Sequence, residues 1–417
     1  MDGEIGRFEF MSYTAVDSSG KAPLNRVNTL YGSLPGKRWY RTVGFKEIAY
    51  THGSTIESYR KTSQWLNRIR HQETGGTPSR TMQDSSEREG IRVLNHLTQT
   101  SEAILKTHGV VDTKLPASVV ASANEREATH LAPETVSAVI EQCGKTELIR
   151  QQMTANPIPY EDPHHSLNIS IDDVGVKRQS EQRPASVPET PTTRKYAYQT
   201  VVHIENQLGS YRLNALGLTV MLTMLLAFLL HNDLLQGPIV VFADGQRSLH
   251  GAILTTFAGV SALQLILDWY HLHEKCKQLL SLACQGRRLR NTHLTHLAAL
   301  LWHGLVDAAL VYLEFIDPDH LKDTTAIDKL KGYLHRNKPH IPCYCVRKQL
   351  GLRNSSNRGE KANDLLVSSR QKHNGMSWSK TGSVALTALT ALVSNQEATH
   401  WFRTGQLNFK LVPHPVK

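Results

Sequence analysis

The order of strand-like segments in the middle of this 417-residue chain constrains its fold more than any other feature. The segment LNISIDDVGVK (167–177) alternates apolar and polar residues, as a strand with one buried face does. A second strand, YAYQTVVHIE (196–205), turns through NQLGS into YRLNALG (211–217), which predicts a hairpin. The short apolar runs IVVFADG (239–245) and LQLILD (263–268) are typical of strands buried on both faces.

Helical patterns separate the later strands, so the order is strand, strand, strand, helix, strand, helix, strand, helix. This order predicts an α/β fold, namely a mixed five-stranded sheet with helices on both faces. It is the order of the ribonuclease-H-like fold.

The rest of the chain has a helical pattern, and TANPIPYEDPHHS (154–166) is a Pro- and His-rich linker. We expect a mostly helical N-terminal region, a catalytic core in two pieces, an all-helical insertion and a C-terminal tail. Their expected bounds are 1–160, then 161–284 with 341–395, then 285–340, and last 396–417.

A helix-turn-helix is predicted near residues 45–72, where Gly53-Ser54 breaks the helical pattern. Ser54 would cap the second helix and Glu57 would complete a capping box. One side of that helix is mainly apolar, and the basic residues elsewhere on it are Arg60, Lys61, Arg68 and Arg70. Such a helix can pack on one face and meet DNA on the other. The alternative, a solvated amphipathic helix, remains open.

Three acidic residues fall at the positions where a metal site can form. Asp172 lies on the polar side of the first strand, Asp244 closes the fourth, and Glu360 begins a helix. Two neighbouring carboxylates repel one another, and a hard divalent cation such as Mg²⁺ relieves that repulsion. Two ions about 4 Å apart can activate an attacking oxygen and stabilise a leaving one. Asp173 competes with Asp172, and each acid alone could be an ordinary strand-end or helix-start residue.

Four segments, SIDDVGVK, VVFADGQRSL, LDWYHLHEKC and GEKANDLLVSSRQKHNGMSWS, together resemble the DDE transposases of bacterial insertion sequences. The resemblance is to the Mutator-like group, whose ribonuclease-H core is interrupted by a helical insertion, and it covers residues 167–395. The group's D-x-x-H motif matches Asp268 to His271, and its Glu matches Glu360. Its downstream Arg and Gly-Met-x-Trp segment match Arg370 and 375–378. Asp173 stands where relatives usually carry Gly.

The resemblance implies metal-dependent strand cleavage and joining at transposon ends, with two Mg²⁺ or Mn²⁺ ions. The implied metal ligands are Asp172, Asp244 and Glu360, with His271 orienting catalytic groups or a DNA phosphate. The implied partners are transposon ends and target DNA, and synapsis of two ends implies a homodimer or a larger assembly. The implied location is the bacterial cytoplasm, in association with the nucleoid.

Cations near the third acid could hold DNA phosphates, and Arg370 and Lys372 are the candidates. Trp378 could stack on an unpaired base, although core packing is the commoner use of a tryptophan. The basic cluster GRRLR (286–290) could follow a DNA backbone or be plain surface. The net charge of +10 and the pI near 9.3 favour a polyanionic partner.

Other functions stay open at this point. His271, His273 and Cys276, with the distant Cys343 and Cys345, are zinc-type ligands, but their spacing is not a familiar finger spacing. The chain could also be a DNA-binding protein that keeps the fold without the chemistry, or a nuclease that cuts without joining.

The apolar run LNALGLTVMLTMLLAFLL (213–230) approaches the length of a membrane span. We expect instead a strand that ends near Gly217, followed by a buried helix, and no membrane partner. Five scattered cysteines and an acidic N-terminus without an apolar signal core fit a reducing cytoplasm better than secretion.

Overall fold

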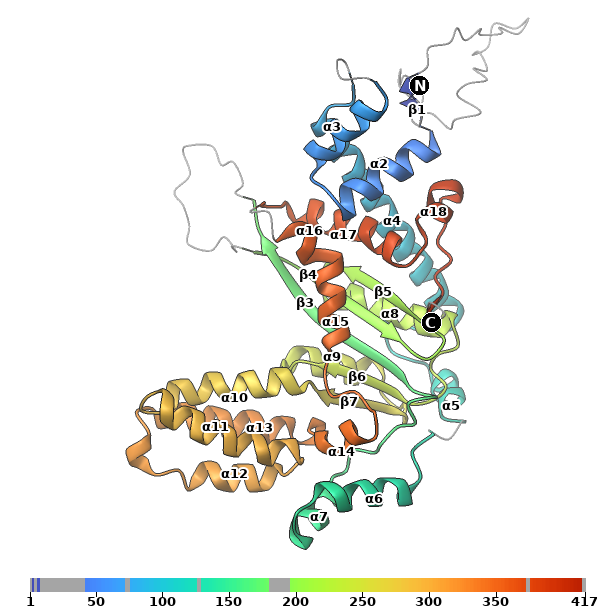
Figure 1. Ribbon diagram of the computed structural model, residues 1–417. Helices are drawn as coiled ribbons and strands as arrows, with labels where there is room; N and C mark the ends of the chain where they lie inside the picture. Colours follow the sequence, from blue (N-terminus) through green and yellow to red (C-terminus); the bar gives the residue numbers. More distant parts are fainter. Residues whose placement is uncertain are drawn as a thin grey trace, which may run out of the picture. The chain divides into compact units, whose positions relative to one another are not determined.

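The computed structural model describes residues 2–3, 6–7, 42–71, 76–125, 129–179, 196–372 and 376–414. Within them the chain is α/β, and its main sheet is open, mixed and six-stranded, in the order β7-β6-β3-β4-β5-β8 (Figure 1). The strands are β3 (Leu167–Lys177), β4 (Tyr196–Glu205), β5 (Gly209–Ala215), β6 (Ile239–Ala243), β7 (Leu263–Leu267) and β8 (Val412–Pro413). A separate two-stranded ribbon joins β1 (Asp2–Gly3) and β2 (Gly6–Arg7).

The five long strands lie at the expected segments, and the direction of three pairs is defined. β3 and β6 are parallel, β6 and β7 are parallel, and β4 and β5 form an antiparallel hairpin. The sixth strand, β8, was not expected. It has only two residues and pairs antiparallel with β5 at the sheet edge, so no alternation pattern reveals it.

Helices make up most of the remaining structure. Before the sheet come α2 (Val43–Thr55), α3 (Tyr59–Ile69), α4 (Ser79–Thr107), α5 (Ala117–Glu125), α6 (Pro133–Cys143) and α7 (Glu147–Thr154). Between and after its strands come α8 (Leu218–His231), α9 (Arg247–Thr256), α10 (Trp269–Ala283), α11 (Arg287–Trp302), α12 (Val306–Glu314) and α13 (Thr324–Asn337). The last group comprises α14 (Tyr344–Gln349), α15 (Asn357–Asn363), a π-helical turn η3 (Asp364–Ser368), α16 (Ser369–Gln371), α17 (Lys380–Ser394) and α18 (Ala398–Thr404). Short 3₁₀ turns η1 (Pro318–His320) and η2 (Lys338–His340) flank α13.

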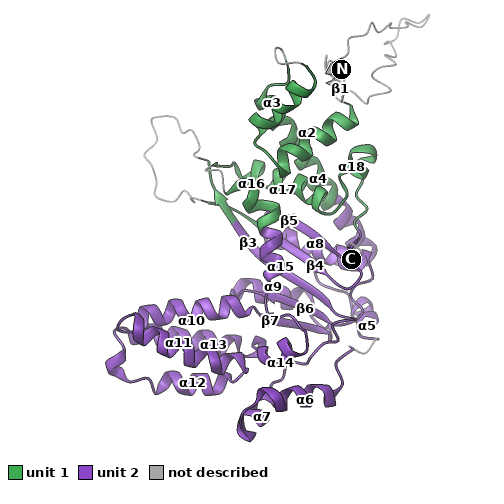
Figure 2. Ribbon diagram, viewed as in Figure 1, with its two compact units in different colours: residues 1–98, 175–199, 364–409 green, residues 99–174, 200–363, 410–417 purple. Residues whose placement is uncertain are grey.

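The chain divides into two compact units, coloured separately in Figure 2. The first unit contains residues 1–98, 175–199 and 364–409, and the second contains 99–174, 200–363 and 410–417. This division differs from the expected one. The N-terminal helices group with segments after residues 174 and 363, which include the end of β3 and the start of β4, whereas residues 99–160 group with the rest of the sheet.

The predicted break at Gly53 and the predicted cap at Ser54 are wrong. The helix α2 continues through both residues, and the buried Ser54 hydroxyl donates to the Thr51 carbonyl. The next helix is capped instead by Ser58, whose side chain accepts a hydrogen bond from the Lys61 amide at 3.2 Å. Either serine fits the sequence rule for a cap, and the hydrogen bond back to the preceding turn keeps Ser54 inside α2.

The basic face of α3 is only partly exposed. Arg60, Lys61 and Arg68 reach solvent, and Lys61 also pairs with Glu57 at 3.1 Å. Arg70 differs from the expectation because it is buried, with its guanidinium 4.8 Å from the centre of the Phe45 ring. Three of the four expected cations are therefore at the surface of this helix.

The helix α8 confirms the expected break near Gly217. That glycine has φ of +95° and precedes α8, and every residue of α8 from Met224 to Leu230 is buried. Within the part of the chain that the structure describes, no helix is long and apolar enough to cross a membrane.

The core of the second unit joins the sheet to the helices that follow it. Side chains such as Phe242 and Ile266 from the strands, Leu280 from α10, Leu297 from α11 and Leu330 from α13 form one buried cluster. In Figure 1, α10 to α13 run alongside one another and begin directly after β7. Because α10 and α13 pack on each other, their residues can meet near the ends of β6 and β7.

A buried ion pair fixes the segment before β3 to α14. The Arg347 guanidinium donates to both Glu161 carboxylate oxygens, at 2.7 and 2.6 Å, and both side chains are almost fully buried. Arg347 also donates to the Arg353 carbonyl at 2.9 Å. This two-pronged geometry satisfies the buried carboxylate fully.

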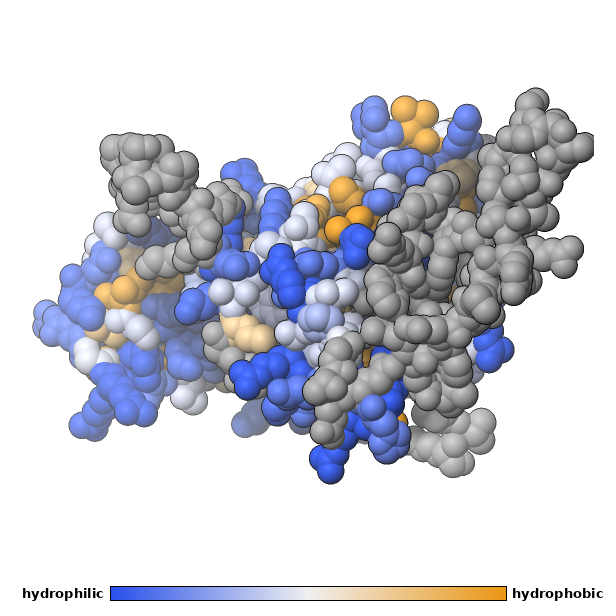
Figure 3. Space-filling view, turned by 90° about the horizontal axis from the view of Figure 1, so that it is seen from above, coloured by the Kyte–Doolittle hydropathy of each residue, from blue (hydrophilic) through white to orange (hydrophobic). Residues whose placement is uncertain are grey.

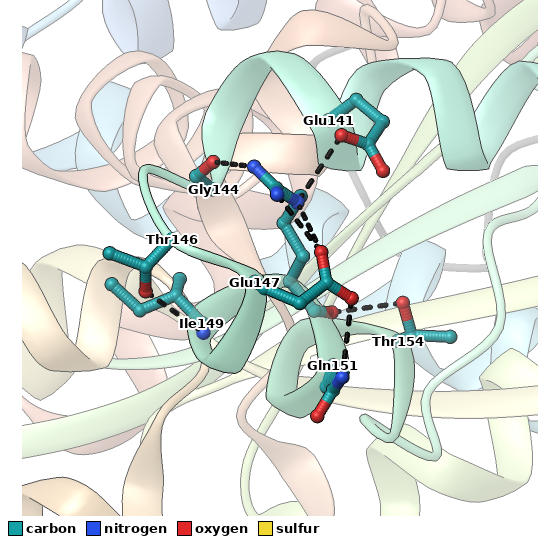
Figure 4. A network of polar contacts seen from close by, with 8 residues as sticks. Glu141, Gly144, Thr146, Glu147, Ile149, Gln151 and Thr154 are labelled. Atoms are coloured by element: carbon teal, nitrogen blue, oxygen red, sulfur yellow. Dashed lines mark hydrogen bonds and ion pairs between the residues drawn. The ribbon is translucent and has the colours of Figure 1, made fainter.

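A polar network holds the corner between α6 and α7 (Figure 4). Arg150 pairs with Glu141 at 3.2 Å and Glu147 at 2.9 Å, and it donates to the Gly144 carbonyl. Thr146 caps α7 by accepting from the Ile149 amide. The network explains the sharp chain reversal without any catalytic role for its two acids.

On the face seen in Figure 3, hydrophilic residues cover most of the visible coloured surface and hydrophobic residues form small separate spots. Exposed apolar side chains elsewhere come from separate elements, for example Leu208 in the β4–β5 turn and Phe315 after α12. Such scattered apolar residues are ordinary for a protein surface.

Candidate functional site

Asp172 and Asp244 come from neighbouring parallel strands. Ser170 of β3 pairs with Phe242 of β6, Asp172 lies two residues further along β3, and Asp244 lies two residues after Phe242, just past the end of β6. Residues in equivalent positions on paired strands lie side by side. The sheet therefore brings these two acids together, as the sequence predicts.

Asp172 is partly buried and holds two hydrogen bonds. Its Oδ1 accepts from the Asp173 amide at 2.8 Å, and its Oδ2 accepts from Asn363 Nδ2 at 2.7 Å. Burial raises the pKa of Asp172 to about 6, His271 opposes that rise, and the nearby Asp244 and Asp173 add to it. A carboxylate in this setting gains from a cation beside it.

Asp173 is exposed and faces a different partner. Its Oδ1 accepts a hydrogen bond from Thr200 Oγ1 of β4 at 2.6 Å. Asp172, not Asp173, is bound to the helix that carries Glu360. This difference favours Asp172 as the functional acid, although Asp173 lies at the same cavity.

A cavity of about 220 Å³ opens between these acids. The polar residues that line it include Asp172, Asp173, Thr200, Asp244 and Gln246. Asp244 Oδ1 accepts from the Gln246 amide at 3.1 Å, which turns the chain from β6 into α9. This cavity is large enough for water or small ions and is lined by acids on two strands.

His250 supports the end of β6 from α9. Its imidazole is hydrogen-bonded to the Asp244 backbone carbonyl, and burial lowers the pKa of His250 despite that bond. The uncharged ring packs edge-on against His340. No sequence motif indicated this support, because it depends on how α9 folds back over the strand.

The D-x-x-H motif forms a local unit at the start of α10. Asp268 caps the helix by accepting from the His271 amide at 3.0 Å, and it also accepts from the Ser356 amide. Burial alone would raise the pKa of Asp268, but hydrogen bonds from His271 and Ser356 outweigh it and lower the pKa.

His271 is held between three carboxylates. Its Nδ1 lies 3.3 Å from Asp268 Oδ1, and this contact with Asp268 raises the pKa of His271, to which the charges of Asp172 and Asp244 also contribute. The side chain is 31% exposed. A half-exposed, more basic imidazole beside two strand-end acids is placed to meet an anionic group.

Glu360 sits on α15, which packs directly on β3. A Cβ at Gly359 would lie 2.5 Å from Ser170 Cβ, so only glycine permits this approach. One turn after Gly359, Asn363 binds Asp172, and a π-helical turn follows at once. Such turns are frequent at functional sites.

Glu360 itself does not line the acidic cavity. Among the residues that the structure describes, no group of three or more His, Cys, Asp or Glu side chains lies close enough to hold a metal ion. The structure brings Asp172 and Asp244 to one cavity and Asp244 and His271 to another, and it places Glu360 on the helix α15 that packs on β3. The zinc-type residues likewise form no ligand group: Cys276, Cys343 and Cys345 are buried.

The expected DNA contacts after Glu360 are mostly internal. Arg370 is buried, donates to the Gly53 carbonyl at 3.1 Å, and stacks over the rings of Tyr59 and Trp378. Trp378 is also buried and serves packing, the alternative use considered above. Lys372 is exposed, and residue 375 of the Gly-Met-x-Trp segment lies outside the described residues. Burial thus removes Arg370 and Trp378, like Arg70, from the surface on which DNA contacts were expected.

Asn363, like His250, is a residue at this site that sequence reasoning missed. It lies three residues after Glu360, so the spacing placed it near the same helix face, but an amide carries no charge signal. Neither a family model nor a curated protein matches this chain.

Proposed function

We propose that the chain is a DNA transposase whose α/β core is ribonuclease-H-like and cleaves and joins DNA at the ends of an insertion sequence. The observation that carries this proposal is the register of β3 and β6, which aligns Asp172 with Asp244. The strand order supports it too. The first three long strands occupy one side of the sheet in reverse sequence order, followed by the fourth and fifth, as in ribonuclease-H-like sheets.

Divalent metal fits the two aligned acids. Burial and the neighbouring carboxylates raise the pKa of Asp172. The charged carboxylate therefore has too little positive charge near it to offset its burial. Asp172 and Asp244 would hold Mg²⁺ or Mn²⁺, with Glu360 as the third ligand supplied from α15. Two such ions, when bound, would activate an attacking oxygen and stabilise a leaving oxygen.

The chain's own residues then bind and orient the DNA. Asn363 keeps Asp172 turned toward α15, and Asp268, 3.3 Å from His271 Nδ1, favours the charged form of the imidazole. A charged imidazole can hold a phosphate oxygen beside the acids. Catalysis of this type depends on positioning and on charge stabilisation. The exposed Arg60, Lys61 and Arg68 would contact the terminal repeats, and synapsis would require a dimer or larger assembly.

Replacing Asp244 tests this function. Asp244→Asn should abolish Mg²⁺-dependent cleavage of the element's ends, whereas Asp328→Asn, at an exposed acid on α13, should leave it intact. Undiminished cleavage by Asp244→Asn would refute the metal role. Glu360→Gln separates the third ligand from the other two, because full cleavage by that variant would remove Glu360 from the site.

Two measurements separate the alternatives. Calorimetric titration of Mn²⁺ should show uptake that Asp244→Asn removes, whereas a binding-only protein would take up no ion at this site. A strand-transfer assay with a pre-cleaved end should give joined product, whereas a simple nuclease would give none.

A further inference from the structure

A second cavity shares Asp244 and Gln246 with the acidic cavity and is not lined by Asp172. It measures about 350 Å³, and its polar lining comes from the end of β6 (Asp244 and Gln246) and from α10 and α13. The residues from the two helices include Lys275, Gln278, Tyr333 and Arg336. This volume is at the low end of the range for small-molecule sites, roughly 300–1,000 Å³. It suits one nucleotide unit rather than a duplex.

Of the two cavities that Asp244 lines, only the larger is also lined by basic side chains. The smaller cavity is lined by three carboxylates, whereas the larger is lined by Lys275 and Arg336 and by the more basic His271. The other acid of the larger cavity, Glu274, is already paired with Lys277 at 2.9 Å. In the described part of the chain, neither Lys275 nor Arg336 has a carboxylate within ion-pair distance.

The wall of this cavity is shaped for close approach. A Cβ at Gly245 would lie 2.4 Å from the Tyr333 hydroxyl, so glycine is needed for that hydroxyl to reach the end of β6. Burial raises the pKa of Tyr333, so the hydroxyl stays protonated and can donate a hydrogen bond. The Arg336 guanidinium lies 5.7 Å from the centre of the Tyr333 ring, which orients it along the same wall.

We propose that this cavity is a phosphate subsite for the DNA strand being cut, in which Lys275 and Arg336 bind a phosphodiester next to the scissile one and the Tyr333 hydroxyl donates to it. The subsite rests on the proposed function, because it takes the neighbouring acids as the cleavage site. It makes α10, which precedes the expected insertion, and α13, which lies within it, direct contributors to strand position. The acidic cavity and the cationic subsite together fix the path of the strand across Asp244.

Binding without metal tests the subsite independently of cleavage. A fluorescent single-stranded oligonucleotide of an element end is titrated in EDTA at several salt concentrations with Lys275→Gln, Arg336→Gln and the control Lys329→Gln. Lys329 is exposed on α13 and does not line the cavity. Each lost phosphate contact should reduce the slope of log K against log salt by about 0.7. We expect that change for the two subsite variants and none for the control, and equal slopes for all three would overturn the subsite.

A phosphate scan locates the contact. Single phosphates of the oligonucleotide are replaced by neutral methylphosphonates, and cleavage is compared for the unaltered protein and Arg336→Gln. Replacing the phosphate next to the scissile one should reduce cleavage by the unaltered protein but not by Arg336→Gln. The methylphosphonate and the Arg336 substitution remove the same interaction, so their effects should not add. The same position mattering equally in both proteins would contradict the assignment.

The outcomes distinguish this inference from the proposed function. If Asp244→Asn abolishes cleavage but the subsite variants bind and cleave like Lys329→Gln, the subsite fails and the function stands. If no Mg²⁺-dependent cleavage occurs but the salt slopes change as expected, the function fails and the phosphate site stands. Displacement of the oligonucleotide by an equimolar deoxynucleoside monophosphate would assign the cavity to free nucleotides, which overturns the DNA assignment.

Discussion

Asp172→Asn should stabilise the protein at neutral pH, although we place Asp172 at the centre of the site. The substitution removes a partly buried charge and keeps the shape of the side chain. The new amide can be accommodated because Asn363 Oδ1 has no hydrogen-bond partner among the described residues. Rotation of the Asn363 amide would let that oxygen accept from the new NH₂ group.

The size of the effect follows from the pKa of Asp172, which burial raises from 3.8 to about 6. A difference of about two pKa units at about 1.36 kcal/mol each gives roughly 3 kcal/mol as an upper value. The folded state binds the proton more tightly than the unfolded chain does. The free energy of unfolding should therefore fall as pH rises from about 4 to about 6, and stay level above that.

The assay is urea unfolding between pH 4 and pH 8 in EDTA, which removes divalent metal. The difference between Asp172→Asn and the unaltered protein should be small at pH 4 and reach up to about 3 kcal/mol at pH 7. Asp173→Asn, at the exposed neighbour, is the control and should show a much smaller rise, since Asp173 is only a minor cause of the raised pKa of Asp172. A difference that does not change with pH, or a less stable Asp172→Asn at pH 7, would refute the argument. Added Mg²⁺ should stabilise the unaltered protein and not the variant.

Three further predictions concern packing and charge. Gly359→Ala should cost about 1–3 kcal/mol in urea unfolding because its Cβ would strike β3, whereas Gly332→Ala, in open space on α13, should cost nothing. Asp268→Asn should lower the pKa of His271, since the contact with the Asp268 carboxylate is the main cause of its rise, and histidine NMR titration measures the change. An unchanged His271 titration would contradict this prediction. Glu161→Gln should cost about 3–5 kcal/mol by leaving its buried arginine partner uncompensated, and a loss under about 1 kcal/mol would show that the pair is not buried in solution.

The sequence pattern correctly predicted those elements whose structure depends on residues close together in the chain. Alternation located β3 and the β4–β5 hairpin, and the apolar runs located β6 and β7, because burial of one or both faces leaves a periodic record. The break at Gly217 was equally visible, since only glycine adopts its positive φ without strain.

The sequence pattern gave wrong predictions where two nearby residues fitted the same role equally well, or where a charged residue is buried by tertiary packing. Ser54 and Ser58 both fit a helix cap, and the hydrogen bond of Ser54 to the preceding turn decided between them. The basic residues Arg70 and Arg370 read as surface cations, yet tertiary packing buries both against aromatic rings. A basic residue in the sequence does not by itself show whether its side chain will be exposed or buried.

The sequence by itself determined which acids could form the site, because Asp172 lies in one strand and Asp244 follows another, and the sequence specifies the type and order of both strands. Only the tertiary structure decided that β3 and β6 pair in a register that aligns those acids, that Asn363 reaches Asp172, and that Lys275 and Arg336 share a cavity with Asp244. The physical reason is the distance along the chain between the residues that interact. Strand and helix patterns arise from contacts within a few residues, whereas a site is made by contacts between residues that are far apart in the chain and meet only when the core closes.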